Sequence, residues 1–117
     1  MSILDTTQIA LEAAMRGSLE RQTLLTNNLA NVDTPGYQRQ DLDFQSTLKS
    51  ALQSGQSPDE VSFRPFTDQQ VVRADGNGVD AEKESANVAE NGLLYQELTQ
   101  IAASREQIFQ TAIGSRS

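Results

Sequence analysis

The 117-residue sequence contains no cysteine, no histidine and no tryptophan. Without cysteine and histidine it cannot form a disulfide, a thiolate or imidazole metal site, or a Ser–His or Cys–His nucleophile pair. Four Phe and two Tyr are its only aromatic residues, and hydrophobic residues make up 37% of the chain, which is low for a globular domain. Since an enzyme needs a dry pocket with shifted titratable groups, this composition favours a structural or interaction protein with no small-molecule substrate and no cofactor.

Basic residues are also scarce, with nine Lys and Arg against 16 Asp and Glu and a net charge of -7. Binding of nucleic acid requires a basic face, so this balance argues against a general nucleic-acid partner. No apolar run approaches the roughly 20 residues that span a bilayer. Residues Met1 to Asp5 have neither the basic nor the apolar region of a signal peptide. We therefore expect no membrane span and no cleaved signal.

The N-terminal unit, residues 1–32, carries apolar residues at alternating spacings of three and four and contains no proline. This period predicts a long amphipathic helix. Ser18 and Gln22 fall on the same stripe and interrupt it half-way. The apolar members of the stripe are Leu4, Leu11, Met15, Leu25, Leu29 and Val32.

The C-terminal unit, residues 80–117, also lacks proline and carries two neighbouring apolar stripes. The first stripe consists of Leu94, Leu98, Ile101, Ile108 and Ala112, with Arg105 interrupting it. The second consists of Val88, Tyr95, Ala102 and Phe109. Both have helical spacing. We predict a mainly α fold in which the long N- and C-terminal helices pair as an antiparallel coiled coil, with the first stripe in the seam.

The middle segment, residues 33–79, is predicted to be irregular or weakly β because Pro, Gly, Ser and Gln punctuate it. Pro35 and Gly36 fit the central positions of a type II turn. Asp43 can cap a short helix that carries Phe44, Leu48 and Leu52 at spacings of four. Residues 61–63 and 70–73 are at best short strands.

So small an apolar inventory predicts a chain of marginal stability when it is alone, because the ordering of two long helices costs much conformational entropy. Two arrangements remain open for the second stripe of the C-terminal helix. Neighbouring copies cover it in one arrangement. In the other, the short helix at residues 44–52 covers it and completes a self-contained three-helix bundle.

Three short motifs stand out, two at the ends of the predicted helices and one within the C-terminal helix. Residues 27–37 read NNLANVDTPGY, where asparagines at a helix end can bond orphan carbonyls or a neighbouring backbone. Residues 75–80 read DGNGVD, which lacks the ligand pattern of a calcium loop and leaves Asp80 as a helix N-cap. Residues 91–96 read NGLLYQ.

Taken together, these motifs resemble in order and spacing the signature of the flagellar rod and hook family. The matching positions are Asn28, Ala30, Asn31, Thr34, Pro35, Gly36, Tyr37, Asp75, Gly76, Asn77, Val79, Asp80, Asn91, Tyr95 and Gln96. The short length and the continuation over residues 37–44 are most similar to a small proximal rod member. Distal rod and hook members are longer and carry an extra β domain.

The resemblance implies a structural subunit of the basal-body rod that polymerises through its terminal helices and transmits torque from motor to hook. It implies passage through the flagellar export apparatus without signal cleavage and assembly in the periplasmic space. It also implies contacts with other rod proteins, a FliE-type adaptor and the inner-membrane ring. The alternatives are a cytosolic coiled-coil adaptor or export chaperone, and an enzyme fragment with a polar pocket.

Overall fold

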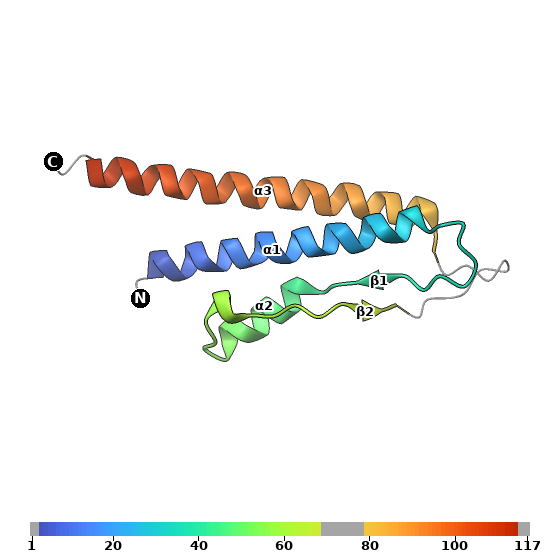
Figure 1. The fold of residues 1–117 in the computed structure, drawn as a ribbon. Helices are drawn as coiled ribbons and strands as arrows, with labels where there is room; N and C mark the ends of the chain where they lie inside the picture. The colour runs from blue at the N-terminus through green and yellow to red at the C-terminus, as the bar shows by residue number, and fades with distance from the viewer. Residues whose placement is uncertain (1–2, 69–78, 115–117) are drawn as a thin grey trace.

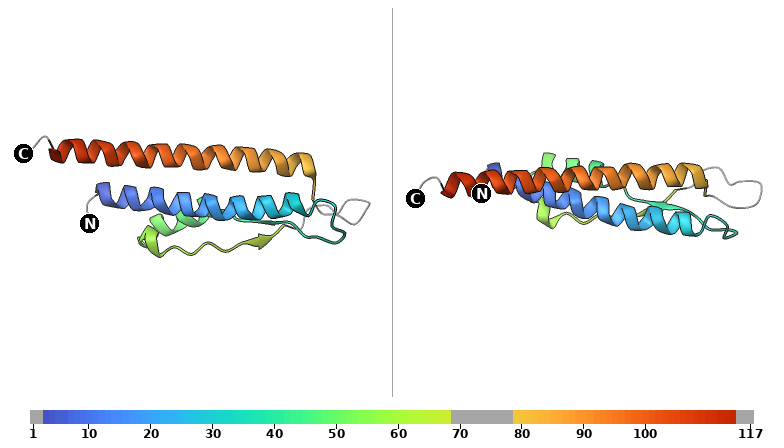
Figure 2. Two further views of the ribbon diagram at one scale, coloured as in Figure 1. Left: turned by 45° about the horizontal axis from the view of Figure 1, so that its top comes forward. Right: turned by 90° about the horizontal axis from the view of Figure 1, so that it is seen from above.

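The computed structural model describes residues 3–68 and 79–114 and has three layers, with one long helix in the middle (Figure 1). Helix α3 covers one side of helix α1, and the short elements of the middle segment cover the other side, as the views in Figure 2 also show. The elements in chain order are α1 (Ile3–Ala30), β1 (Gln40–Asp41), α2 (Phe44–Gln53), the 3-10 helix η1 (Pro58–Glu60), β2 (Phe66–Thr67) and α3 (Ala81–Gly114).

The molecule is long and thin, with principal extents of 67 × 27 × 13 Å. Its radius of gyration is 18.0 Å, whereas a globular domain of this length has about 13 Å. The length comes from α1 and α3, which have 28 and 34 residues and therefore span about 42 and 51 Å. The two helices run antiparallel, and β1 and β2 form a minimal antiparallel pair. The predicted mainly α fold class is confirmed.

The interface between α1 and α3 is polar at its centre. Asn91 of α3 is buried, and its Nδ2 donates to the carbonyl oxygen of Ser18 and to Oε1 of Gln22, both at 2.8 Å. Gln22 in turn donates from Nε2 to the carbonyl oxygen of Val88 at 3.3 Å. The predicted interruption of the α1 stripe is therefore the place where α1 receives an asparagine from α3.

These hydrogen bonds set the rotation of α3, and the burial of its stripes differs from the prediction. Ala102 of the second stripe is 8% exposed, whereas Ile101 and Ile108 of the first stripe are 49% and 68% exposed. With Asn91 directed into α1, residues at helical spacing from it turn the same way. As far as Ala102 the second stripe therefore lies toward α1, whereas Phe109 of this stripe and Ile101 and Ile108 of the first stripe are exposed.

A small apolar core lies between α1 and the middle segment. The rings of Phe44 and Phe63 meet edge to face, with centroids 6.3 Å apart, a favourable geometry for aromatic pairs. Arg16 extends over the Phe63 ring and donates from Nη2 to the carbonyl oxygen of Val61 at 2.9 Å. The core residues are Ala13, Leu42, Phe44, Leu48, Ala51, Val61 and Phe63.

Helix α2 begins as the sequence predicts, because Oδ1 of Asp43 accepts a hydrogen bond from the Ser46 amide at 3.2 Å. It lies on α1, and in the described part of the chain no Cα atom of α2 comes within 8 Å of one in α3. The predicted three-helix bundle, in which α2 covers the second stripe of α3, is therefore wrong. Residues 61–63, for which the sequence predicts at best a short strand, pack against α1 without strand pairing, in line with the predicted irregular middle segment. Residues 70–73 lie outside the described residues.

Gly17 permits the close approach of α2 to α1. A Cβ atom at this position would lie 2.6 Å from Cβ of Phe44 and 2.8 Å from its Cγ. These atoms are next to the backbone and cannot swing away. The absence of a side chain at Gly17 is thus a packing requirement that helix periodicity does not reveal.

We expect Gly17→Ala to destabilise the chain by about 1–3 kcal/mol through this overlap, although alanine is the better helix former by about 1 kcal/mol. The free energy of unfolding is measured in urea, in buffer with sucrose to favour the folded state. Gly92→Ala is the matched control, because its Cβ would meet only Nε2 of Gln22 at 3.6 Å. Equal effects of the two substitutions would refute the packing role of Gly17.

Candidate functional site

Asn28, in the first motif, ties the end of α1 to both other layers. It is fully buried. Its Oδ1 accepts from the Gln40 amide at 3.0 Å, and its Nδ2 donates to the Gln40 carbonyl oxygen at 2.7 Å. Nδ2 also donates to Oε1 of Glu84 on α3 at 2.9 Å. The amide of Asn28 thus replaces a strand partner for β1 and bonds α3 at the same time.

The rest of the first motif ends α1 and turns the chain. Nδ2 of Asn31 donates to the Asn27 carbonyl oxygen at 2.8 Å, and Oγ1 of Thr34 donates to Oδ1 of Asn31 at 3.1 Å. The Tyr37 amide then donates to the Thr34 carbonyl oxygen at 3.2 Å, and Gly36 has a φ of 76°. Positive φ at the third position is the mark of a type II turn, so the predicted Pro35–Gly36 turn is confirmed.

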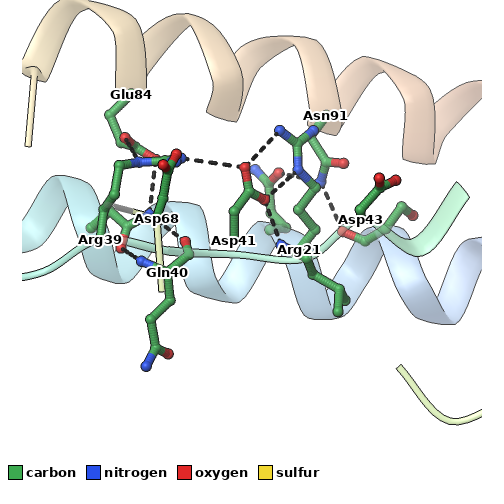
Figure 3. A network of polar contacts seen from close by, with 12 residues as sticks. Arg21, Arg39, Gln40, Asp41, Asp43, Asp68, Glu84 and Asn91 are labelled. Carbon is green, nitrogen blue, oxygen red and sulfur yellow. Dashed lines mark hydrogen bonds and ion pairs between the residues drawn. The ribbon is translucent and has the colours of Figure 1, made fainter. Parts of the chain in front are cut away.

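Arg39 is the centre of a buried polar network that Figure 3 shows between α1, β1 and α3. Its guanidinium forms a bidentate pair with Glu84, from Nε to Oε2 and from Nη2 to Oε1, both at 3.0 Å. It also donates from Nη1 to Asp68 and from Nη2 to Oδ2 of Asp41 at 3.4 Å. Arg39 and Glu84 are 5% and 1% exposed. Such pairs are strongly directional, so β1 and α3 are fixed relative to each other.

Arg21 extends the network to α1. It donates from Nε to Oδ1 of Asp41 at 2.7 Å and from Nη2 to Oδ2 at 3.2 Å. We call this set of residues the polar junction. Its members are Arg21, Asn28, Arg39, Asp41, Asp68 and Glu84.

The charges of the polar junction shift the pKa values of two members. Burial acts to lower the pKa of Arg39, but the hydrogen bond and charge of Glu84, with Asp41 and Asp68, outweigh burial and hold that pKa above its ordinary value. Burial likewise acts to raise the pKa of Asp41. The hydrogen bonds from Arg21 and the Leu42 amide, with the charge of Arg39, outweigh it and leave the pKa of Asp41 below its ordinary value. Both groups are therefore charged at neutral pH.

Because the folded chain lowers the pKa of Asp41, the ionised carboxylate stabilises the fold, and this contribution is present above the unfolded pKa. It is lost as the pH falls through the lower, folded pKa. We expect Asp41→Asn to lower the free energy of unfolding at pH 7 and to flatten its decline below about pH 5. Urea unfolding between pH 3 and pH 7 measures this, with exposed Asp33→Asn as control. An unchanged acid decline in Asp41→Asn would contradict the role of this carboxylate.

The other two motifs lie at the start of α3 and in its first half. Asp80 is the N-cap, since its Oδ1 accepts from the Glu82 and Lys83 amides at 3.0 and 3.3 Å, and Val79 beside it is buried. Asn91 is the buried partner of α1 described above. Tyr95 is half-buried. Ala30 and Gln96 are exposed, and Asp75, Gly76 and Asn77 lie outside the described residues.

The predicted seam residues differ in burial. Leu25 is fully buried. Half-buried members are Leu11, Met15, Leu29, Leu94 and Leu98. Over residues 101–114 of α3 only Ala102 is buried, and the large apolar side chains there face solvent. They are Ile101, Ile108, Phe109 and Ile113, with exposures of 49%, 68%, 49% and 55%.

Sequence reasoning missed the charged members of the polar junction. It predicted no ion pair for Glu84 or Asp41, whereas the structure shows that both are bonded to arginine. It gave Arg39 and Asp68 no role. No local pattern identifies these pairs, because Arg39 and Glu84 are 45 positions apart in the sequence. The one usable signal was Asn28, one of the asparagines expected to bond either orphan carbonyls or a neighbouring backbone.

In the described part of the chain, no group of three or more acidic residues is placed to hold a metal ion. No described helix combines the length and the apolarity that a membrane crossing requires. What the site offers is a rigid turn, a buried polar junction and an exposed apolar helix end.

Comparison with known proteins finds consistent relatives. Residues 4–38 match the family model described as Flagella basal body rod protein. Relatives named Flagellar basal body rod protein FlgB occur in several bacteria. The protein of Escherichia coli (strain K12) is 35% identical, and the match covers 74% of this chain and 82% of the relative. The protein of Yersinia enterocolitica is 35% identical, and the match covers 73% of this chain and 77% of the relative. The protein of Bacillus subtilis (strain 168) is 31% identical, and the match covers 86% of this chain and 87% of the relative.

Proposed function

The chain belongs to the flagellar basal body rod protein family, with FlgB proteins among its relatives, and on this premise we propose that it polymerises through its terminal helices and transmits torque from motor to hook. A rod structural protein in the flagellar basal body acts through contacts between subunits. Its function therefore depends on the surfaces that a single copy leaves uncovered.

The observation that carries the proposal is the exposed apolar end of α3, defined here as Ile108, Phe109 and Ile113. An apolar stripe of this kind on a single chain marks an interaction surface. A groove of about 270 Å³ between this end and the start of α1, lined in part by Gln8, Phe109 and Ala112, adds to that surface. Neighbouring copies gain stability by burying both.

A contact between different surfaces of identical copies does not close on itself and generates a helical filament or tube. Such a contact transmits torque only if each subunit keeps its shape. The polar junction supports this requirement, because directional charged hydrogen bonds fix the middle segment to both long helices. Pro35 and Gly36 set the direction in which the middle segment leaves α1.

The partners of this chain follow from the position of the rod within the basal body. Other rod proteins are its partners, and we propose in addition a FliE-type adaptor and the inner-membrane ring. We also propose that the chain passes through the flagellar export apparatus without cleavage and assembles in the periplasmic space. The thin, core-poor fold supports this route, because little buried surface has to be exposed for passage.

We expect Ile108→Asp and Ile101→Asp to abolish assembly, because a charge buried without a partner is strongly unfavourable. Motility and the amount of the chain in isolated basal bodies measure the effect. Gln107→Asp adds the same charge at another exposed position and is expected to assemble normally. All three should leave the circular dichroism of the purified chain unchanged. Wild-type motility of Ile108→Asp would contradict assembly through the end of α3.

A further inference from the structure

A second apolar hollow lies between α2 and α3, with α1 as its floor. Its volume is about 420 Å³. The apolar residues that line it are Ala14, Phe44, Leu48, Leu52, Leu94 and Leu98. We call it the α2–α3 groove.

The α2–α3 groove remains open within one chain. Helix α2 packs on α1 and keeps its Cα atoms more than 8 Å from those of α3 in the described chain. Leu52 at its edge is 44% exposed, and Ile101, which follows Leu98 by one helical turn, is 49% exposed. Its apolar lining therefore continues along α3 as far as Ile101.

We propose that the α2–α3 groove binds the exposed end of α3 from a second copy of this chain. The end of α3 carries bulky apolar side chains that project into solvent, of which Ile108 is 68% exposed. A concave apolar surface and a protruding one are thus present on the same molecule. The end of the chain's own α3 cannot fill the groove, because Ile113 lies on the same straight helix as Leu98, fifteen residues and about 22 Å farther along.

Charge at the two surfaces is complementary. Lys49 lines the groove, and Glu106 lines the hollow at the end of α3. Neither residue takes part in the ion pairs that the described residues form. Arg105 lines the same hollow as Glu106. A second copy that docks with Glu106 facing Lys49 brings an anion to a cation, whereas docking with Arg105 facing Lys49 brings two cations together, so the charges favour the first orientation.

The groove and the end of α3 are different surfaces, so the contact is head to tail and repeats from copy to copy. This inference rests on the proposed rod function and names the two surfaces that meet. A symmetric contact, in contrast, would close at a dimer.

The absence of cysteine makes the contact directly testable. Leu52→Cys and Ile108→Cys are combined in one chain, which replaces the parent chain in cells, and isolated basal bodies are treated with a short bis-maleimide. The control chain combines Leu19→Cys with Ile108→Cys, because Leu19 is 53% exposed on α1 and does not line the groove. Circular dichroism of the purified chains verifies that the substitutions leave the helix content unchanged.

We expect a ladder of crosslinked dimers, trimers and larger species from the Leu52→Cys, Ile108→Cys chain, and no ladder from the control. Product that stops at dimers would overturn the head-to-tail contact. A crosslink from Leu52→Cys to a different protein, or no crosslink in basal bodies that contain the chain, would overturn the second copy as occupant while leaving the rod function intact. Absence of the parent chain from basal bodies would instead refute the rod function itself.

Discussion

Replacement of Glu84 by alanine is expected to destabilise the chain by about 3–5 kcal/mol, the cost of leaving a buried charge without its partner. Arg39 would lose both bonds of its bidentate pair while remaining 5% exposed. Asn28 would lose the acceptor for one of its Nδ2 hydrogens. A loss of this size unfolds a chain of marginal stability at room temperature. Urea unfolding in sucrose-containing buffer measures the change.

Two comparisons separate lost pairing from a general effect of removing an acid. Glu82→Ala removes a carboxylate from the same turn of α3, but Glu82 is exposed, so its effect should stay within about 0.5 kcal/mol. The double substitution Arg39→Met, Glu84→Leu removes both charges and should recover much of the loss, because apolar residues can replace a buried ion pair. If the double substitution is as unstable as Glu84→Ala, burial of an unpaired charge is not the cause.

The second large effect is expected for Phe44→Ala, with a loss of about 3–5 kcal/mol. Phe44 is 3% exposed, packs edge to face on Phe63 and lies against the helix backbone at Gly17. It begins α2 and packs that helix onto α1. Its removal should release α2 and leave the α1–α3 pair in place.

Leu52→Ala provides the matched control, since Leu52 lies on the same helix but is 44% exposed. We expect its effect on the free energy of unfolding to be below about 1 kcal/mol. Circular dichroism follows the helix content, and amide hydrogen exchange locates the loss. Equal protection of α2 amides in Phe44→Ala and in the parent chain would contradict the anchoring role of Phe44.

Features that depend on local sequence could be predicted. The turn at Pro35 and Gly36 is set by the φ preferences of those two residues. Asp43 and Asp80 cap helices through amides two or three positions away. The long helices follow from a period that repeats over many residues.

Features that depend on partners distant in the sequence could not be predicted. Ser18 and Gln22 were recognisable as a break in a stripe, but nothing near them indicates that Asn91 fills it. The seam of α3 was assigned by apolar content, whereas buried Asn91 and Glu84 determine which stripe lies toward α1. In a chain with so few apolar residues, polar contacts decide the register, and hydrophobic period alone does not report them.

The same polar contacts explain how a thin molecule keeps one shape. The apolar cluster at α2 is small, and the junction around Arg39 fixes the opposite end of the α1–α3 pair. The bidentate Arg39–Glu84 pair allows one orientation of α3 relative to the segment that carries Arg39. The relative orientation of the elements is therefore well defined, although the free energy of unfolding is small. This suits a subunit that gains further stability from contacts with its neighbours.

The most direct test of assembly through the terminal helices is a density map of the basal body in which side chains of this chain are resolved. We predict that neighbouring chains cover Ile101, Ile108 and Phe109, which are 49%, 68% and 49% exposed in a single copy. We also predict that the α1–α3 pairing through Asn91 is retained. If these three side chains still face solvent in the assembled rod, assembly does not proceed through the end of α3.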